Sequence, residues 1–150
     1  MSIQGHFKKI CIYALLKYYE SYGYCNTGAM TMLKDKIATF VGKVQAIDGV
    51  AACALVSRDG IIAGKSFDRD LNEPWFGALA ATIFASAESA GSIIRMKSME
   101  MVTIRAPDCS IVVVGAGENF LIAAIVKDIT DQENVYRNML AVAKEIGQVL

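Results

Sequence analysis

The chain has 150 residues, a length that fits one domain with a sizeable hydrophobic core. Hydrophobic residues make up 54% and charged residues 20%, and 15 basic side chains balance 15 acidic ones. This balance offers no electrostatic attraction to a phosphate backbone, so we expect no nucleic-acid partner.

The cysteines Cys11, Cys25, Cys53 and Cys109 are widely spaced without a CxxC motif, and His6 is the single histidine. Metal sites need clustered ligands, so we expect no metal and no other cofactor. Cys53 and Cys109 lie in apolar runs and are interpreted as small buried hydrophobes of a reduced, cytoplasmic protein. Because no run of 18 or more uncharged apolar residues occurs, we expect no transmembrane segment.

Residues 1–31 differ from the rest and are interpreted as an N-terminal extension, with the domain spanning 32–150. Apolar residues at helical spacing predict an amphipathic helix of about four turns, followed by a loop over 22–28. These residues are Phe7, Ile10, Cys11, Ala14, Leu15, Tyr18 and Tyr22. Two alternatives stay open: the helix docks on the domain, a membrane surface or a partner, or translation begins at Met30 or Met32.

The first half of the domain reads as a helix and a β-hairpin. Apolar residues over 33–47 follow one helical face, and Asp48-Gly49 ends the helix. Two β-like runs follow at 50–57 and 61–67, and the Asp59-Gly60 turn between them is a strong hairpin signal.

The next predicted helix is almost uncharged. Asn72 is a natural N-cap with Pro74 in the first turn, and between Pro74 and Arg95 the only charged residue is Glu88. A surface helix of a monomer should carry one apolar stripe and one charged face. We therefore expect this helix to meet another subunit or partner, with burial inside its own monomer as the alternative.

Two sides of this helix can be distinguished from the spacing of its residues. A heptad-type seam with two flanking residues consists of Phe76, Ala80, Ile83, Ala87, Ala90 and Ile94, with Leu79 and Phe84 beside it. The opposite side carries small residues that permit close approach of another helix: Ala78, Ala81, Ala85, Ser89 and Ser92.

Three strands and a helix complete the chain. Residues 98–106 alternate in polarity, whereas 109–114 and 120–126 are continuously apolar and predict central strands. A glycine-rich hairpin loop over 115–119 separates the last two. Thr130 and Glu133 form a predicted capping box, and the final helix runs to the chain end.

The sequence contains no complete motif for catalysis or nucleotide binding. The segment 60–66 resembles a phosphate-binding loop but is one residue short between its glycines, and it is predicted as a strand. The Gly115-Ala116-Gly117 run lacks a third glycine and a following helix. With no histidine in the domain, Ser-His-Asp and Cys-His chemistry are excluded there, so we expect a protein that is not an enzyme.

The order of elements and several local signatures resemble the Roadblock family, which includes dynein light chains, endosomal scaffold subunits and prokaryotic regulators. The resemblance covers about 33–150, including the alanine-rich helix from Trp75. The other matching segments are Ile47-Asp48-Gly49-Val50, Leu55-Val56-Ser57-Arg58-Asp59-Gly60 and Gly117-Glu118-Asn119-Phe120-Leu121.

The resemblance implies an α+β sandwich of order α-β-β-α-β-β-β-α, a five-stranded antiparallel sheet with helices on both faces, related to longin and profilin-like folds. It also implies dimerisation through the third strand and the second helix of the domain, as a homodimer or with a Roadblock paralogue. The implied interface comprises Phe76, Leu79, Ala80, Ile83, Phe84, Ala87, Ala90, Met99, Met101 and Thr103.

The function implied by the resemblance is a non-catalytic adaptor or regulator that binds a Ras-like small GTPase through the face of the second helix. Arg58, Arg69 and Arg95 are candidates only by position for an arginine supplied to a GTPase in trans. Two alternatives are a structural scaffold subunit of a larger complex and a profilin-like small-molecule sensor. The sensor would need a pocket with a few orienting polar groups, and the predicted core holds almost none.

Overall fold

The structure, a computed structural model, describes residues 28–67, 71–128 and 131–150. The predicted amphipathic helix of the N-terminal extension therefore lies outside the described residues. The chain divides into two compact units, Met1–Lys36 and Ile37–Leu150, and the second unit contains the whole sheet.

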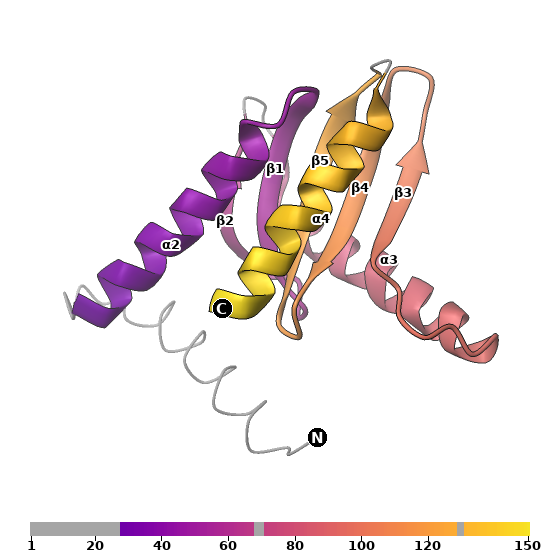
Figure 1. Cartoon of the computed structure of the whole chain (residues 1–150), viewed down its shortest axis with the longest axis horizontal. Coiled ribbons are helices and arrows are strands. Elements are labelled where there is room, and N and C mark those ends of the chain that lie inside the picture. Colours follow the sequence, from indigo (N-terminus) through magenta and orange to yellow (C-terminus); the bar gives the residue numbers. More distant parts are fainter. Residues whose placement is uncertain (1–27, 68–70, 129–130) are drawn as a thin grey trace. The chain divides into compact units, whose positions relative to one another are not determined.

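The described elements follow the predicted order α-β-β-α-β-β-β-α (Figure 1). All neighbouring strands pair antiparallel, and the strand order is β2-β1-β5-β4-β3, which confirms the five-stranded antiparallel sheet. The bounds are α2 Gly28–Gln45, β1 Val50–Ser57, β2 Ile62–Ser66, α3 Glu73–Ile93, β3 Met101–Arg105, β4 Cys109–Ala116, β5 Phe120–Lys127 and α4 Gln132–Val149.

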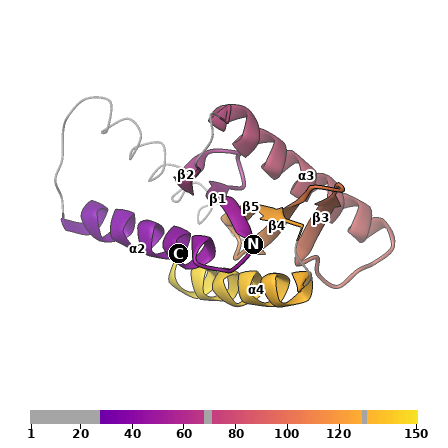
Figure 2. The same ribbon diagram turned by 90° about the horizontal axis from the view of Figure 1, so that it is seen from above.

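Within the second unit, helices cover both faces of the sheet. Figure 2 shows α4 and the end of α2 on one face and α3 on the other. β1, β4 and β5 are buried along most of their length, as their continuous apolar sequences predict. The sheet is therefore the centre of a three-layer sandwich, and α3 is the sole helix on its face among the described residues.

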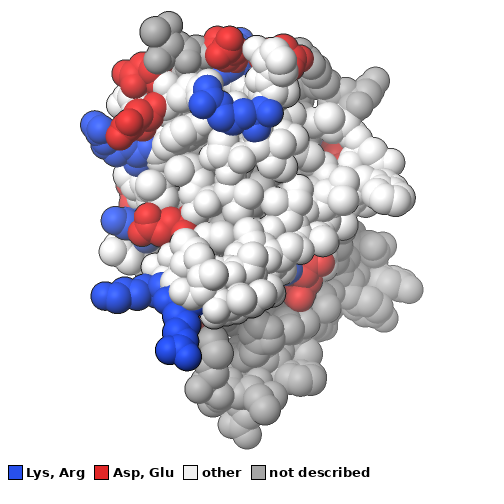
Figure 3. Space-filling model, turned by 90° about the vertical axis from the view of Figure 1, so that its right-hand side faces the viewer, with Lys and Arg blue, Asp and Glu red and all other residues white. Residues whose placement is uncertain are grey.

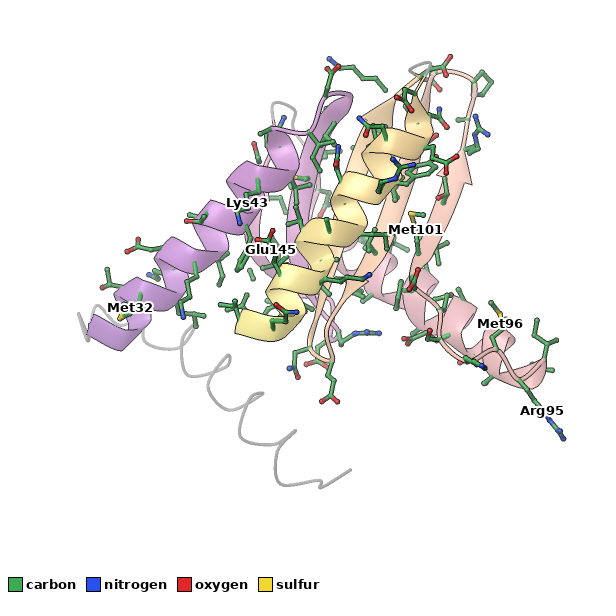
Figure 4. All side chains as sticks on the ribbon, in the orientation of Figure 1. Met32, Lys43, Arg95, Met96, Met101 and Glu145 are labelled. Carbon is green, nitrogen blue, oxygen red and sulfur yellow. The ribbon has the colours of Figure 1, made fainter. Side chains whose placement is uncertain are left out.

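The face beneath α2 and α4 is closely packed. Lys43 of α2 pairs with Glu145 of α4 across the outside of this layer (Figure 4). Beneath the two helices, a cavity of about 10 Å³ lies between Val44, Cys53 and Ile146, room for about one water molecule. Burial raises the pKa of the Cys53 thiol to about 11, so this cysteine is a small core residue, as predicted.

Some predicted boundaries are wrong. α2 begins at Gly28, five residues before the predicted start, and β4 continues through Gly115 and Ala116, which pair with β5. The N-cap of α4 is Asp131 instead of the predicted Thr130, because the Asp131 side chain accepts the Asn134 N–H at 3.1 Å.

A pair of glycines fixes how the β4–β5 turn meets α4. Gly117 has a φ of +72°, and a Cβ on it would lie 2.8 Å from the Cα of Gly147. Gly117→Ala should lower the free energy of unfolding by about 2 kcal/mol or more, since strain and collision add. Gly42→Ala, in an open part of α2, should instead raise it by about 0.5–1 kcal/mol. Urea denaturation of both variants measures this contrast, and equal effects would contradict it.

Candidate functional site

The surface with the most unusual composition is formed by α3 and the neighbouring edge strand β3, here called the α3–β3 surface. α3 begins as predicted: the Asn72 side chain accepts the Trp75 N–H at 3.4 Å, and Pro74 lies in the first turn. It ends in a Schellman-type cap, in which the N–H of Met96 bonds to Gly91 O at 3.0 Å and that of Arg95 to Ser92 O at 3.1 Å. Arg95 has a φ of +57° there.

The inner stripe of α3 consists of small residues around one large one. Its buried residues are Gly77, Ala80, Ala81, Phe84 and Gly91. Ala80, Ala81 and Phe84 pack on a cluster of the sheet that includes Val56, Val113 and Leu121. Gly77 instead lies against Gly60, and Gly91 lies against Met96. Gly115 of β4 makes room for Phe84, because a Cβ at Gly115 would lie 2.9 Å from the ring carbon Cζ. The helix therefore lies close to the sheet, and its inner stripe is narrow.

This packing corrects two predicted interface residues. Ala80 is 3% exposed and Phe84 is 1% exposed, so both belong to the core of their own chain and present no surface to a partner. The heptad-type seam runs partly inward, because the sheet and not a second helix takes these two positions. Of the remaining predicted residues on α3, Leu79 and Ala90 are exposed, and the half-buried ones are Phe76, Ile83 and Ala87.

The other predicted interface residues lie on or beside the edge strand β3. Directly opposed residues of an antiparallel pair share a face of the sheet. Met101 and Thr103 oppose Val114 and Val112 and lie on the α4 face, whereas Val102 opposes Val113 on the α3 face. Met99 and both residues of the α4 face are half-buried. Among the described strands, β3 pairs only with β4, so its other edge is open to a further strand.

α3 extends past this edge (Figures 1 and 2). Its 21 residues make a helix about 31 Å long, whereas five strands span about 19 Å from first to last. The projecting end carries large apolar side chains without cover: Ile93 is 83% and Ile94 72% exposed, and Met96 follows them. At the other end of the helix Trp75 is 66% exposed.

Ala81, predicted on the small-residue side, is 9% exposed and belongs to the buried stripe, because the sheet takes this position. The remaining small-residue side, with Thr82 beside it, is apolar in effect. The hydroxyl of Thr82 donates to Ala78 O at 2.8 Å, and that of Ser89 to Ala85 O at 3.0 Å. Ser92 likewise donates to Ser89 O at 2.8 Å. Because these hydroxyl protons already have acceptors, this side requires no acceptor from a partner. Figure 3 views the side where β3 and the end of α3 lie, and its broad central area carries no charged side chain.

Charged residues around α3 are mostly engaged within the chain. Arg58 donates to the Glu88 carboxylate at 2.9 Å and to Gly117 O at 3.0 Å, and Lys65 pairs with Glu73. Arg95 is exposed and points away from the domain (Figure 4). Arg69 lies outside the described residues. Of the candidate arginines, Arg58 is thus held in place and Arg95 is accessible.

By length and composition alone, α3 is the one described helix that could cross a membrane, although 28% of its most apolar stretch is buried in the domain. The sequence predicts no such segment because Glu88 interrupts the helix before it reaches 18 uncharged apolar residues in a row. Core helices of soluble proteins can be equally long and apolar. Because Phe84 and its neighbours pack against the sheet, only the outer sides of α3 lack cover.

Ligand chemistry has little support in the described residues. No group of three or more His, Cys, Asp or Glu in this part of the chain could hold a metal ion. A shallow groove of about 330 Å³ lies between Arg58, Glu100, Gly115 and Lys144. The segment 60–66 forms a turn and the strand β2, which confirms the predicted strand in place of a phosphate-binding loop.

Sequence reasoning missed three exposed residues of the α3–β3 surface: Trp75, Ile93 and Met96. Trp75 lies in the first turn of α3, where one apolar residue does not show which side of the helix it occupies. Ile93 and Met96 do carry a signal in the sequence. Together with Ile94 they place three large apolar side chains within the four residues before Lys97, at the end of the predicted helix.

Truncating inner and outer residues of α3 should separate its two roles. Phe84→Ala should lower the free energy of unfolding by about 3–5 kcal/mol, since it opens a cavity beneath the helix. Leu79→Ala should change it by no more than about 0.5 kcal/mol in the monomer, because Leu79 is exposed. Urea unfolding at protein concentrations that keep the sample monomeric gives both values. Similar losses for the two variants would contradict this assignment of faces.

Comparisons with known proteins agree with this architecture. The Roadblock/LC7 domain model matches residues 36–126. No curated protein matches the sequence. MglB from Myxococcus xanthus superposes with a TM-score of 0.71 at 13% identity, covering 76% of this chain and 94% of that chain.

Two further solved structures share the fold. An MglB described as having a tetrameric arrangement gives a TM-score of 0.70 at 12% identity, covering 77% of this chain and 88% of that one. Profilin II from Acanthamoeba castellanii gives 0.53 at 19% identity, covering 75% and 98%. These structures confirm the predicted relation to profilin-like folds. Since the family model matches more than half of its residues, this chain belongs to the Roadblock/LC7 domain family.

Proposed function

We propose that this chain is a non-catalytic homodimeric adaptor or regulator that binds a Ras-like small GTPase through the face bearing α3. The observation that carries the proposal is the α3–β3 surface: an open strand edge beside a helix whose uncharged outer sides project past that edge. Dimerisation through these elements and docking of Ras-like GTPases are what family membership implies. An MglB of the same fold is described as having a tetrameric arrangement, which supports the proposed self-association.

The geometry favours one arrangement of two copies. If the β3 strands pair antiparallel about a two-fold axis perpendicular to the sheet, the two sheets become continuous and both α3 helices lie on one face. Residues with the same parity then oppose each other, so Val102 and Ile104 meet their counterparts beneath the helices. The projecting end of each α3 reaches past the edge toward the partner, where Ile93 and Ile94 gain apolar contacts.

The two helices side by side would form the platform for the GTPase. Such a protein acts on the nucleotide site of its partner and needs no catalytic residues of its own. Trp75 and Leu79 offer exposed apolar anchors on this platform, and tryptophan is enriched among the residues that dominate interface energies. A Ras-like partner is cytoplasmic, and we propose the same location for this chain.

The projecting end of α3 provides the sharpest test of dimerisation. Ile93→Asp should weaken the dimer by about tenfold or more, because burying an unpaired carboxylate in an apolar contact is costly. The fold should be unaffected, since Ile93 is exposed in the monomer. The matched control is Asn138→Asp, which adds the same charge at an exposed position of α4. Analytical ultracentrifugation of the full chain compares them, and an unaltered Ile93→Asp dimer would remove α3 from the interface.

Binding to a GTPase is tested separately. Purified Ras-like GTPases of the source organism, each loaded with GDP or a non-hydrolysable GTP analogue, are titrated with the full chain by calorimetry. We expect one of them to bind with an affinity that depends on the nucleotide, and Trp75→Ala to weaken that binding by about tenfold or more. Binding by none would leave the scaffold-subunit alternative, and binding unaffected by Trp75→Ala would move the docking face away from α3.

A further inference from the structure

The segment that joins α3 to β3 is exposed and has an unpaired backbone. Residues 92–98 are all exposed. Hydrogen bonds hold the two ends of the segment: the Met96 N–H donates to the end of α3 at 3.0 Å, and Glu100 O accepts an N–H of β4 at 3.0 Å. Among the described residues, no backbone hydrogen bond involves 97–99. This stretch is therefore free to lie in extended form in the cleft of another protein.

Ser98 lies in this segment with an unengaged hydroxyl group. Its side chain is exposed and has no hydrogen-bond partner among the described residues. The hydroxyls of Thr82, Ser89 and Ser92 differ, because each donates to a carbonyl of α3. Ser86 is exposed as well, but it lies inside the helix. Ser98 thus combines an accessible oxygen with a backbone outside regular secondary structure.

Two basic residues directly precede this serine. Arg95 lies three residues before Ser98 and Lys97 one residue before it, and no other arginine of the chain has a serine or threonine at that spacing. Both side chains are exposed, and neither forms an ion pair within the described residues. Arg95 points away from the domain (Figure 4). An acidic substrate cleft would attract both cations, since charge complementarity favours recognition.

We propose that Ser98 is a phosphorylation site of a serine/threonine protein kinase that recognises basic residues before its target, and that the phosphate weakens association through the α3–β3 surface. The co-substrate is ATP. A bond forms from the Ser98 oxygen to the γ-phosphorus of ATP, and the bond from that phosphorus to the leaving oxygen of ADP breaks. The hydroxyl proton passes to a carboxylate of the kinase, so the transfer is balanced.

The phosphate reverses the sign of the charge beside the edge strand. Two basic side chains and one acidic side chain give residues 95–100 a formal charge of +1, and a phosphate adds about −1.5 to −2 at pH 7. The exposed apolar side chains of Ile94 and Met96 lie just before Ser98. A partner that covers them has to remove water from the phosphate, which is costly. This effect rests on the proposed α3–β3 association, whereas the phosphorylation site itself does not.

A kinase assay on the full chain tests the phosphorylation site. The chain is incubated with ATP, Mg²⁺ and the catalytic subunit of cyclic-AMP-dependent protein kinase, which prefers basic residues before its target. Mass spectrometry of peptides then locates the phosphate, which we expect on Ser98. Arg95→Gln should lower kcat/KM for this site about tenfold or more, whereas the control Ser86→Ala should match the wild type. An unmodified Ser98, or equal turnover of Arg95→Gln, would overturn the assignment.

The effect on association is measured by sedimentation equilibrium. The dimer dissociation constant of the phosphorylated chain should be about fivefold or more above that of the unmodified chain. Ser98→Asp and Ser98→Asn are a pair of equal size, and we expect the first to weaken the dimer about threefold and the second to leave it unchanged. Equal constants for the two forms of the chain, or equal weakening by both variants, would overturn the effect. An unmodified chain that stays monomeric would overturn the proposed dimer together with this effect, while the kinase assay decides the site independently.

Discussion

The length of α3 exceeds the width of the sheet that it covers. The features of the α3–β3 surface follow from this mismatch. The sheet can bury only one narrow stripe of the helix, and it does so through glycines and alanines around Phe84. Two outer sides and the projecting end remain bare. In a charged helix this would be ordinary solvent exposure, but after its first residue, Glu73, α3 carries only the charge of Glu88, so the bare sides are apolar surface that favours association.

The fold could be predicted from the sequence because its local signals agree with one another. Asp59-Gly60 specifies a hairpin, Asn72 a helix start, and the continuous apolar runs of β4 and β5 specify central strands; the structure has all of these. Boundaries were less certain where two residues offered similar chemistry. Thr130 and Asp131 can both cap a helix, and the choice is decided by which side chain reaches the Asn134 N–H, a geometric fact that spacing does not contain.

The rotation of α3 could not be predicted in the same way. A helix that is apolar nearly all round has no polar face to mark the outside, so the heptad-type seam included Ala80 and Phe84, which the sheet buries. The missing information is non-local: Gly115 lies 31 residues after Phe84 in the sequence, yet it makes the space for that ring. Arg58 and Glu88 are likewise 30 residues apart, and no local pattern links them.

The proposed association of so apolar a surface with a partner requires that its few polar groups be satisfied before the partner arrives. The structure does this in two ways. Hydroxyls of Thr82 and Ser89 donate to carbonyls of their own helix, and the Glu88 carboxylate receives Arg58. Each arrangement removes a penalty that docking would otherwise incur, since an unpaired buried carboxylate costs far more than a hydroxyl. The charged group therefore needs a dedicated partner from another element, whereas the hydroxyls need only the helix backbone.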